Sequence, residues 1–459
     1  MKNKELLLKV AVLLLVCLMG IALFSGCTEQ NGEEGTEQES EENFKPAEDK
    51  GEESELFKRY EEYKENATLA FKNSPIAPKD DFSYEISGGK VKIVKYTGDE
   101  SVIVVPERID DAPVTTISKG AFCGGGLRAV YLPDSVESIE QGAFDDCGGL
   151  STLRLPFIGD GAENEFLGYI FGGDEPDENA VTVPPSLKMV IVGEGCDEIA
   201  ARSFKGAKTL NAVVLSDTVK KIGDLAFYQC ADLVFVDLGG ATEIGEYAFG
   251  NCKSLYSIDI SGADKVGHGA LYFCSSLHSL TANFGANDFL GELFGAESPD
   301  YNGEFVPSSL RVVSVAEGCR KIPDRAFASC KFITEVKLPE SLETVGIRAF
   351  YSCRSLESID ITDKVKAIGD DAFFGCDNMS SVELGASLEV IGMQAFYGCK
   401  AIKTVECPKS LKEIKASAFY GCSSLEKISL GGVQRIGKDA FSACPKLPPI
   451  DAGGVEIEK

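Results

Sequence analysis

The fold is decided by a unit that reads Leu356-Glu357-Ser358-Ile359-Asp360-Ile361, then Val365-Lys366-Ala367-Ile368-Gly369, then Ala372-Phe373-Phe374-Gly375-Cys376. This phrasing recurs along the chain, and the apolar residue that most often stands three positions before a Cys marks each copy. The markers are mostly 22 or 23 residues apart: Phe122, Phe144, Phe204, Phe227, Phe249, Leu271, Phe327, Phe350, Phe373, Phe396, Phe419 and Phe441. A unit this short cannot bury its own apolar face, so successive units must stack into a solenoid.

Each unit predicts two short strands and a turn. Apolar residues at the first, fourth and sixth positions of Leu356–Ile361 predict a strand whose remaining side chains face outward. Val365–Gly369 predicts a second apolar edge, and Phe373 would fill the interior of the turn. Because the strands of successive units would pair about 4.8 Å apart, we predict a β-rich solenoid of short parallel strands with about 14 turns.

Two intervals between markers are much longer, at 60 and 56 residues, and predict enlarged turns at 157–186 and 284–309. Related segments in the two intervals lie a constant 123 residues apart, as Phe171 and Phe294 do, which indicates a higher-order duplication. Loops inserted on one edge of a repeat array often carry binding function. A bulky structural turn is the other interpretation.

The N-terminus predicts export and anchoring. Three lysines precede an apolar run from Val10 to Phe24, which suits a secretory signal and is short for a membrane span. The run ends in Leu23-Phe24-Ser25-Gly26-Cys27. This ending resembles a bacterial lipoprotein signal, which implies removal of residues 1–26 and a lipid on Cys27. An ordinary signal peptide or a single-span anchor is the alternative.

The residues that follow predict a leash. Residues 27–55 are rich in Glu, Gln, Gly and Ser with almost no apolar side chains, and predict a disordered acidic tether. Residues 56–80 predict a short helix and linker, because Leu56, Tyr60 and Tyr63 stand among charges. We expect the apolar face of this helix to dock on the end of the solenoid, with binding to a partner as the alternative.

The combined phrase Ile-Gly-x-x-Ala-Phe-x-x-Cys resembles the BspA-type leucine-rich repeat family of bacterial and protozoan surface proteins. The resemblance covers about residues 81 to 450. Residues 81–122 resemble the N-terminal entry of the family, which would cap the first turn. Repeats would then occupy residues 123–450 and a tail residues 451–459. The resemblance implies a right-handed curved leucine-rich-repeat solenoid used for extracellular binding or adhesion.

Composition limits the partners and activities that the chain can have. The 459-residue chain carries a net charge of -27, which disfavours nucleic acid as a partner. It has two histidines and no tryptophan, and it carries no metalloprotease, nucleophile-elbow or phosphate-loop motif. We therefore expect no enzyme activity, no cofactor and no metal site.

Most of the 16 cysteines recur once per turn, three residues after the marker. This set consists of Cys147, Cys230, Cys252, Cys274, Cys330, Cys353, Cys376, Cys399, Cys422 and Cys444. In a solenoid they would form a ladder of free buried thiols, because stacked Cβ atoms point the same way and suit a disulfide poorly. Bridges or metal binding are the alternatives. Cys123, Cys196, Cys319 and Cys407 lie off this ladder.

One outward strand position predicts a binding face. Turn by turn it reads Tyr131, Arg154, Val214, Asp237, Asp259, Thr281, Lys337, Asp360, Glu383, Glu406 and Ser429. Stacking would align these side chains in one row on the concave face, where the carboxylates could meet a basic partner or Ca²⁺. The alternative is a solvated face that resists aggregation. Tyr131, Val214 and Phe235 would add apolar contact area.

Together these features predict a lipid-anchored lipoprotein of the cell envelope that is displayed extracellularly. It would bind a host or neighbouring-cell protein or glycan, without catalysis, through the concave face and the inserted loops. The main alternative is a structural lipoprotein that organises other envelope proteins. A solute-capture lipoprotein or an enzyme fits the sequence least.

Overall fold

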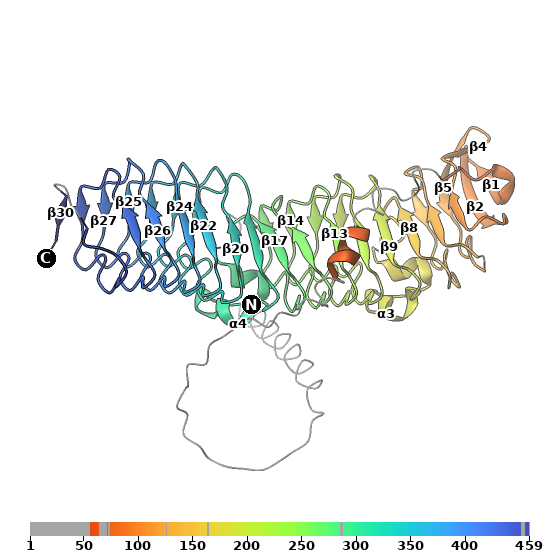
Figure 1. Cartoon of the computed structure of the whole chain (residues 1–459). Helices are drawn as coiled ribbons and strands as arrows, with labels where there is room; N and C mark the ends of the chain where they lie inside the picture. Colours follow the sequence, from red (N-terminus) through yellow and green to blue (C-terminus); the bar gives the residue numbers. More distant parts are fainter. Residues whose placement is uncertain are drawn as a thin grey trace, which may run out of the picture. The chain divides into compact units, whose positions relative to one another are not determined.

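The computed structural model describes residues 56–63, 71, 74–124, 126–162, 165–284, 288–450 and 455–458. Over these residues the repeats stack in sequence order, from the orange strands to the blue strands of Figure 1. They form a parallel β-solenoid of about 16 turns with a spacing of about 23 residues. The predicted fold class is confirmed, and the predicted count of about 14 turns is close.

The predicted signal peptide (1–26), Cys27 and the tether (27–55) lie outside the described residues. In the described part of the chain, no helix has the length and apolar character needed to cross a membrane.

In most turns one strand belongs to a row that we name the first-strand sheet. It consists of β3 (Val102–Val104), β6 (Ala129–Tyr131), β8 (Thr152–Leu155), β9 (Met189–Val192), β11 (Ala212–Val214), β13 (Phe235–Asp237), β15 (Ser257–Asp259), β17 (Ser279–Ala282), β18 (Val312–Val315), β20 (Glu335–Lys337), β22 (Ser358–Ile361), β24 (Ser381–Leu384), β26 (Thr404–Glu406) and β28 (Lys427–Ser429). Paired strands run parallel with equivalent residues opposite, as Val213 lies opposite Val190 and Val236. Alternate side chains therefore point to the interior and to the outer face.

A second, two-residue strand follows in most turns. These strands are β7 (Ser138–Ile139), β10 (Glu198–Ile199), β12 (Lys221–Ile222), β14 (Glu243–Ile244), β16 (Lys265–Val266), β19 (Lys321–Ile322), β21 (Thr344–Val345), β23 (Ala367–Ile368), β25 (Val390–Ile391), β27 (Glu413–Ile414), β29 (Arg435–Ile436) and β30 (Glu456–Ile457). The last of them falls in the predicted C-terminal tail, and it extends this row by pairing with β29.

The N-terminal end carries extra strands. A 3-10 helix, η1 (Lys79–Asp81), leads into β1 (Phe82–Ser87), which pairs antiparallel with β2 (Lys90–Tyr96). β5 (Ala112–Ile117) pairs with β2, with β7 and, antiparallel, with β4 (Arg108–Ile109). This group stands at the end of the stack in Figure 1, where it covers the first turn.

The marker residues fill the interior of the turns. Phe350 and Phe373 are fully buried, and their rings stack with centroids 5.0 Å apart and planes 2° apart. The separation matches the spacing of paired strands and is also a favourable distance for aromatic stacking. Each turn therefore places its ring on the ring of the turn before, which explains why the marker is nearly always Phe.

The predicted cysteine ladder lies beside this stack. Cys376 is fully buried, and its Sγ donates a hydrogen bond to the carbonyl oxygen of Phe350, one turn back, at 3.2 Å. The same contact recurs from Cys147, Cys230, Cys252, Cys274, Cys353, Cys399, Cys422 and Cys444. The described cysteines are free thiols. The nine cysteines with this contact each link two turns, whereas the ladder residue Cys330 is buried and contacts the Ala328 carbonyl of its own turn at 4.0 Å.

The enlarged turns hold short helices that enter the core. The first contains η2 (Leu167–Phe171), η3 (Pro176–Glu178) and α3 (Asn179–Thr182), and the second contains η4 (Leu290–Phe294), η5 (Pro299–Tyr301) and α4 (Asn302–Phe305). Phe144 donates its amide hydrogen to the Ile170 carbonyl as other markers do to the next turn, so η2 itself supplies a solenoid turn.

A buried asparagine holds each enlarged turn. The Oδ1 of Asn179 accepts a hydrogen bond from the Gly168 amide at 2.6 Å, while its Nδ2 donates to the Ser203 carbonyl at 3.1 Å. Asn302 makes the equivalent contact with Gly291 at 2.7 Å. A Cβ at Gly168 would collide with the Asn179 side chain. These contacts fit the interpretation of the enlarged turns as structural elements.

Candidate binding face

The outward side chains of the first-strand sheet do form a row in register. Tyr131 lies opposite Arg154, and Asp360 lies opposite Glu383. The structure adds Val104 in β3, opposite Tyr131, at the N-terminal end of the row. It also adds two residues further along that the sequence interpretation missed, Ile191 in β9 and Ser314 in β18. Both follow an enlarged turn, where counting from marker to marker fails. Their strands were visible in the sequence, and alignment of those strands would have placed both residues in the row.

Phe235 lies in a neighbouring row and not in the row of Tyr131. It is opposite Ala212, which is in turn opposite Met189, two positions before the row of Asp237. These three side chains form a cluster of their own on the outer face, separate from the interior. We name Met189, Ala212, Phe235, Tyr256 and Asn211 the helix seat, because the N-terminal helix covers them.

The N-terminal helix, residues 56–63, docks on this seat. The prediction that it would dock on the end of the solenoid is wrong. Tyr60 packs edge-on against Phe235, with ring centroids 5.6 Å apart, and Phe235 is only 8% exposed as a result. Figure 1 shows the helix in red beside β13. The docking position follows from chemistry, since the seat offers the apolar outer surface that the aromatic face of the helix requires.

The chain crosses the same face again further along. The Phe71 ring packs edge-on against Tyr131, with centroids 5.6 Å apart. Ile76 then bridges to Val104 of β3, and the Ala77 amide donates to the Val104 carbonyl at 2.9 Å. Residues near the N-terminus thus cover parts of the face between β3 and β15.

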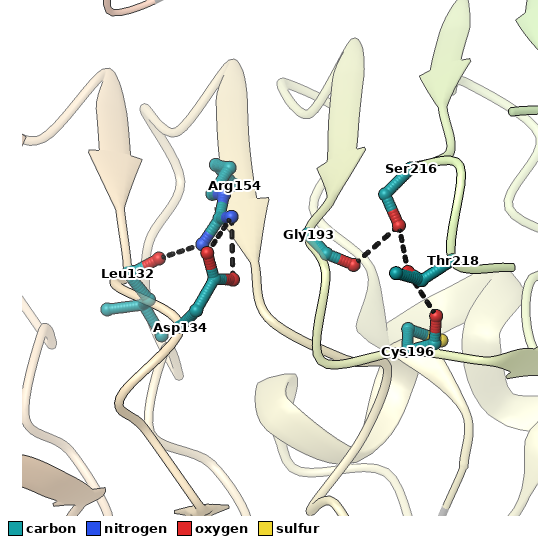
Figure 2. Close-up of polar contacts among 7 residues, drawn as sticks. All are labelled: Leu132, Asp134, Arg154, Gly193, Cys196, Ser216 and Thr218. Carbon is teal, nitrogen blue, oxygen red and sulfur yellow. Dashed lines mark hydrogen bonds and ion pairs between the residues drawn. The ribbon is translucent and has the colours of Figure 1, made fainter.

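The Arg154 side chain is held by contacts with other residues of the chain (Figure 2). Its guanidinium donates to the Leu132 carbonyl at 2.7 Å, forms an ion pair with Asp134 at 2.6 Å, and lies 4.6 Å over the Tyr131 ring. Only 9% of the side chain is exposed. A Cβ at Gly193 would collide with the guanidinium and with the Asp134 carboxylate, so a larger residue there would displace the Arg154 side chain from these contacts. Arg154 therefore offers little of its charge to a ligand, contrary to expectation.

The turns beside Arg154 are linked by hydroxyl groups, also drawn in Figure 2. The Ser216 hydroxyl donates to the Gly193 carbonyl at 2.9 Å, and the Thr218 hydroxyl donates to the Cys196 carbonyl at 2.8 Å. The two hydroxyls are 2.6 Å apart. Polar groups on this stretch are thus satisfied between turns.

The C-terminal part of the row is open and charged. Lys337, Asp360, Glu383 and Glu406 are exposed. Lys337 lies 3.6 Å from Glu335 of the same strand. Among the described residues, no ion pair involves Asp360, Glu383 or Glu406. These three carboxylates face solvent at successive turns, where they can attract a cationic partner.

A hollow of about 770 Å³ lies in the middle of the face, lined by Tyr60, Phe235, Asp237, Asp259 and Thr281 among others. It lies where the described strands β13, which pairs with β11, and β15, which pairs with β17, do not pair with each other. The carboxylates of Asp237 and Asp259 each accept a hydrogen bond from the backbone amide two residues ahead, at 3.1 and 2.9 Å. Each carboxylate keeps acceptor capacity for a ligand.

Short connections accompany this hollow. The segment between the first and the second strand of a turn has five residues at 238–242 and at 260–264. The equivalent segment at 215–220 has six. Gly239 adopts a φ of 57°, and a Cβ there would collide with the Ser216 carbonyl. Glycine allows the shortened connection to pack directly on the turn before it.

Comparison with known proteins identifies the repeats. The pattern described as BspA type Leucine rich repeat region matches in six copies, over residues 108–163, 182–297, 302–385 and 320–448. These matches cover well over half of the chain. The chain belongs to the BspA-type leucine-rich repeat family.

Solved structures similar to this BspA-type chain include a leucine-rich repeat protein from Bacteroides ovatus, with 21% identity over 81% of this chain and 93% of that chain and a TM-score of 0.32. A leucine rich cell surface protein from Faecalibacterium prausnitzii is 22% identical over 84% of this chain and 96% of that chain, with a TM-score of 0.28. A leucine-rich repeat protein from Leptospira interrogans is 11% identical over 72% and 85%, with a TM-score of 0.37. No curated protein matches the chain.

The buried side chains of the BspA-type repeats show little chemical reactivity. Burial raises the pKa of the Cys274 and Cys353 thiols to about 12, so both stay protonated at neutral pH and are poor nucleophiles. Within the described ranges, no group of three or more His, Cys, Asp or Glu side chains is arranged to hold a metal ion. The features that can meet a partner are therefore those on the outer face.

Proposed function

We propose that the chain is a cell-surface lipoprotein, anchored through Cys27, that acts as a non-catalytic scaffold for binding a host or neighbouring-cell protein or glycan. Membership of the BspA-type family supports a repeat scaffold, and the signal-like sequence ending at Cys27 supports export and anchoring. The observation that carries the proposal is the open row of Asp360, Glu383 and Glu406 on a rigid stack of turns.

A rigid row of this kind favours multivalent contact. Successive carboxylates repeat at about the strand spacing of 4.8 Å, so one extended cationic partner could meet several of them together. Each exposed contact is weak, because water and salt screen it. Several contacts made together raise the affinity without any single strong site.

A binding screen tests the proposal directly. The chain without its signal, residues 28–459, is presented to matrix proteins, mucin and glycans, and each bound ligand is titrated at two salt concentrations. Reversing the row charges with Asp360→Lys, Glu383→Lys and Glu406→Lys should weaken binding of a cationic ligand at least about tenfold. Binding that is unchanged by this variant would remove the row from the proposal.

The matched control reverses three exposed carboxylates off the row, with Glu194→Lys, Glu246→Lys and Glu340→Lys. The net charge changes equally, so a loss of binding specific to the row variant assigns the contact to the row. Protease treatment of intact cells addresses location. If residues 81–459 stay uncut while a known surface protein is cleaved, and the chain pulls down envelope proteins instead of external ligands, the structural-lipoprotein alternative replaces this proposal.

A further inference from the structure

The helix seat carries its own occupant. Phe57, Tyr60 and Tyr63 are spaced three residues apart along the N-terminal helix and therefore project from one side of it. Tyr60 contacts Phe235 and Tyr256 at ring-centroid distances of 5.6 and 6.0 Å, and Phe57 contacts Tyr256 at 5.9 Å. The seat thus receives an aromatic helix face, which is a common way for a protein surface to recognise a peptide.

The seat also contains a buried polar anchor. The Tyr63 hydroxyl donates to Oδ1 of Asn211 at 2.8 Å. The Nδ2 of Asn211 donates to the Asp232 carbonyl at 2.9 Å, and the residue is only 5% exposed. The Asp232 carbonyl fixes the orientation of the amide, which leaves Oδ1 as the acceptor for an incoming group. The seat therefore selects a hydroxyl donor beside the aromatic contacts.

The apolar character of the seat has no role inside the solenoid. In β9, β11 and β13 the alternate residues Val190, Val213 and Val236 already fill the interior, while Met189, Ala212 and Phe235 point outward. The corresponding outward residues of the C-terminal strands are polar: Glu335, Ser358, Ser381, Thr404 and Lys427. A polar outer face is thus compatible with this fold, and the apolar one requires a separate cover.

The cover rests mainly on side-chain contacts. The described part of the helix, residues 56–63, meets the seat through the rings of Phe57 and Tyr60 and the Tyr63 hydroxyl. Phe57 remains 48% exposed. The hollow beside Tyr60 is bordered by Asp237 and Asp259, where a larger or more basic occupant would find additional contacts. A second helix that replaced the N-terminal helix could therefore bind the helix seat and gain further contacts in the hollow.

We propose that the helix seat is a binding site for a short amphipathic helix of a partner protein, filled at rest by residues 56–63 of the chain itself. The partner helix carries aromatic residues three positions apart and a tyrosine whose hydroxyl reaches Asn211. Because the resident helix is joined to the solenoid, its effective concentration is high, and the partner displaces it only by binding more tightly. The inference rests on the proposed function in taking the outer face as the partner-binding face.

A peptide experiment tests this inference. In the full chain, Tyr60→Ala with Tyr63→Ala removes the contacts of the resident helix and should free the seat. A fluorescent synthetic peptide with the sequence of residues 54–66 should then bind this variant at least about tenfold more tightly than the unmodified chain, whose seat is filled. Circular dichroism and urea unfolding of the variant should show an intact solenoid.

The controls are made in the peptide, so that they leave the solenoid unchanged. A peptide with Tyr60→Ala and Tyr63→Ala should not bind, and one with Tyr63→Phe should bind several-fold more weakly because the hydroxyl to Asn211 is lost. Equal binding to both forms of the chain, or binding to neither, overturns the inference. So does unfolding of the variant, because the helix would then be an integral part of the fold.

The outcome is distinguishable from that of the ligand screen. External ligands that bind through Asp360, Glu383 and Glu406 support the proposed function even if the peptide fails. A peptide that binds the freed seat supports the helix site even if the screen finds no external ligand.

Discussion

Strands β9 to β13 and strands β22 to β26 occupy the same row of the solenoid, yet their outer faces differ. Over β9 to β13 the outward side chains are mainly apolar and lie under the N-terminal helix. Over β22 to β26 they are polar or charged and exposed. The interiors are alike, since Phe rings stack at 4.7 Å in one region and 5.0 Å in the other. Stacking thus constrains the interior of every turn and leaves the outer face free to diverge.

The largest expected effect comes from high pH, and it should be shared by the cysteine ladder that runs through both regions. Burial raises the pKa of Cys274 and Cys353 from 9.0 to about 12, so the folded state holds these protons more tightly than the unfolded state. This contribution is fully present below pH 9 and is lost as pH rises toward 12, at about 1.4 kcal/mol per pKa unit and thiol. Urea midpoints should fall steeply over this range.

Thiol labelling with mass spectrometry shows where that loss occurs. Cys274 and Cys353 should become reactive together as pH rises, while the half-buried Cys123 reacts earlier. Labelling of one ladder cysteine while the other stays protected would show that the two interiors differ.

Removing one marker ring from each region comes next in size. Phe227→Ala and Phe373→Ala should each cost about 3–5 kcal/mol, because both rings are fully buried between two stacked neighbours. Hydrogen exchange of the adjacent strands, together with urea unfolding, measures the loss locally, as a repeat array need not unfold in one step. Costs that differ by more than about 2 kcal/mol would contradict the equivalence of the interiors.

A smaller effect on the free energy of unfolding should distinguish Arg154 from Lys337, two cationic residues of the same row. Arg154→Ala should cost about 1–3 kcal/mol, because it strands Asp134 and the Leu132 carbonyl, and the partial exposure of Asp134 moderates the loss. Lys337→Ala should stay within about 0.5 kcal/mol, since that side chain is exposed. Urea unfolding compares them, and equal costs would mean that row position, and not burial, sets the energy.

The smallest effect is expected for the open carboxylates. The triple variant Asp360→Asn, Glu383→Gln and Glu406→Gln should change the free energy of unfolding by no more than about 0.5 kcal/mol. None of the three carboxylates has an ion-pair partner among the described residues, and like charges are removed from neighbouring turns. A loss above about 2 kcal/mol in urea unfolding would show that the row is structural.

Much of the fold was predictable because each turn repeats the packing of the one before. The Phe373 and Cys376 positions follow from the period alone, and so does the register of Asp360 with Glu383. Prediction failed where the period is interrupted. Ile191 and Ser314 were missed because insertions precede their strands.

The candidate face was predictable in register but not in accessibility. Arg154 and Asp237 occupy equivalent positions, yet the first is buried against Asp134 and the second is exposed. Phe235 reads as open apolar surface in the sequence, and the N-terminal helix covers it. No local pattern distinguishes these cases, because each depends on what another part of the chain places on top.

The sequence by itself therefore determined the solenoid, its Phe stack and its cysteine ladder, since a period of 22 or 23 residues forces the same side chains into contact at every turn. Only the tertiary structure decided which part of the outer face is open. The contact between Tyr63 and Asn211 joins residues 148 positions apart. Such a contact does not recur with the repeat. It forms because the aromatic side of the helix and the apolar seat, which are far apart in the sequence, both lose exposed apolar surface when they pack together.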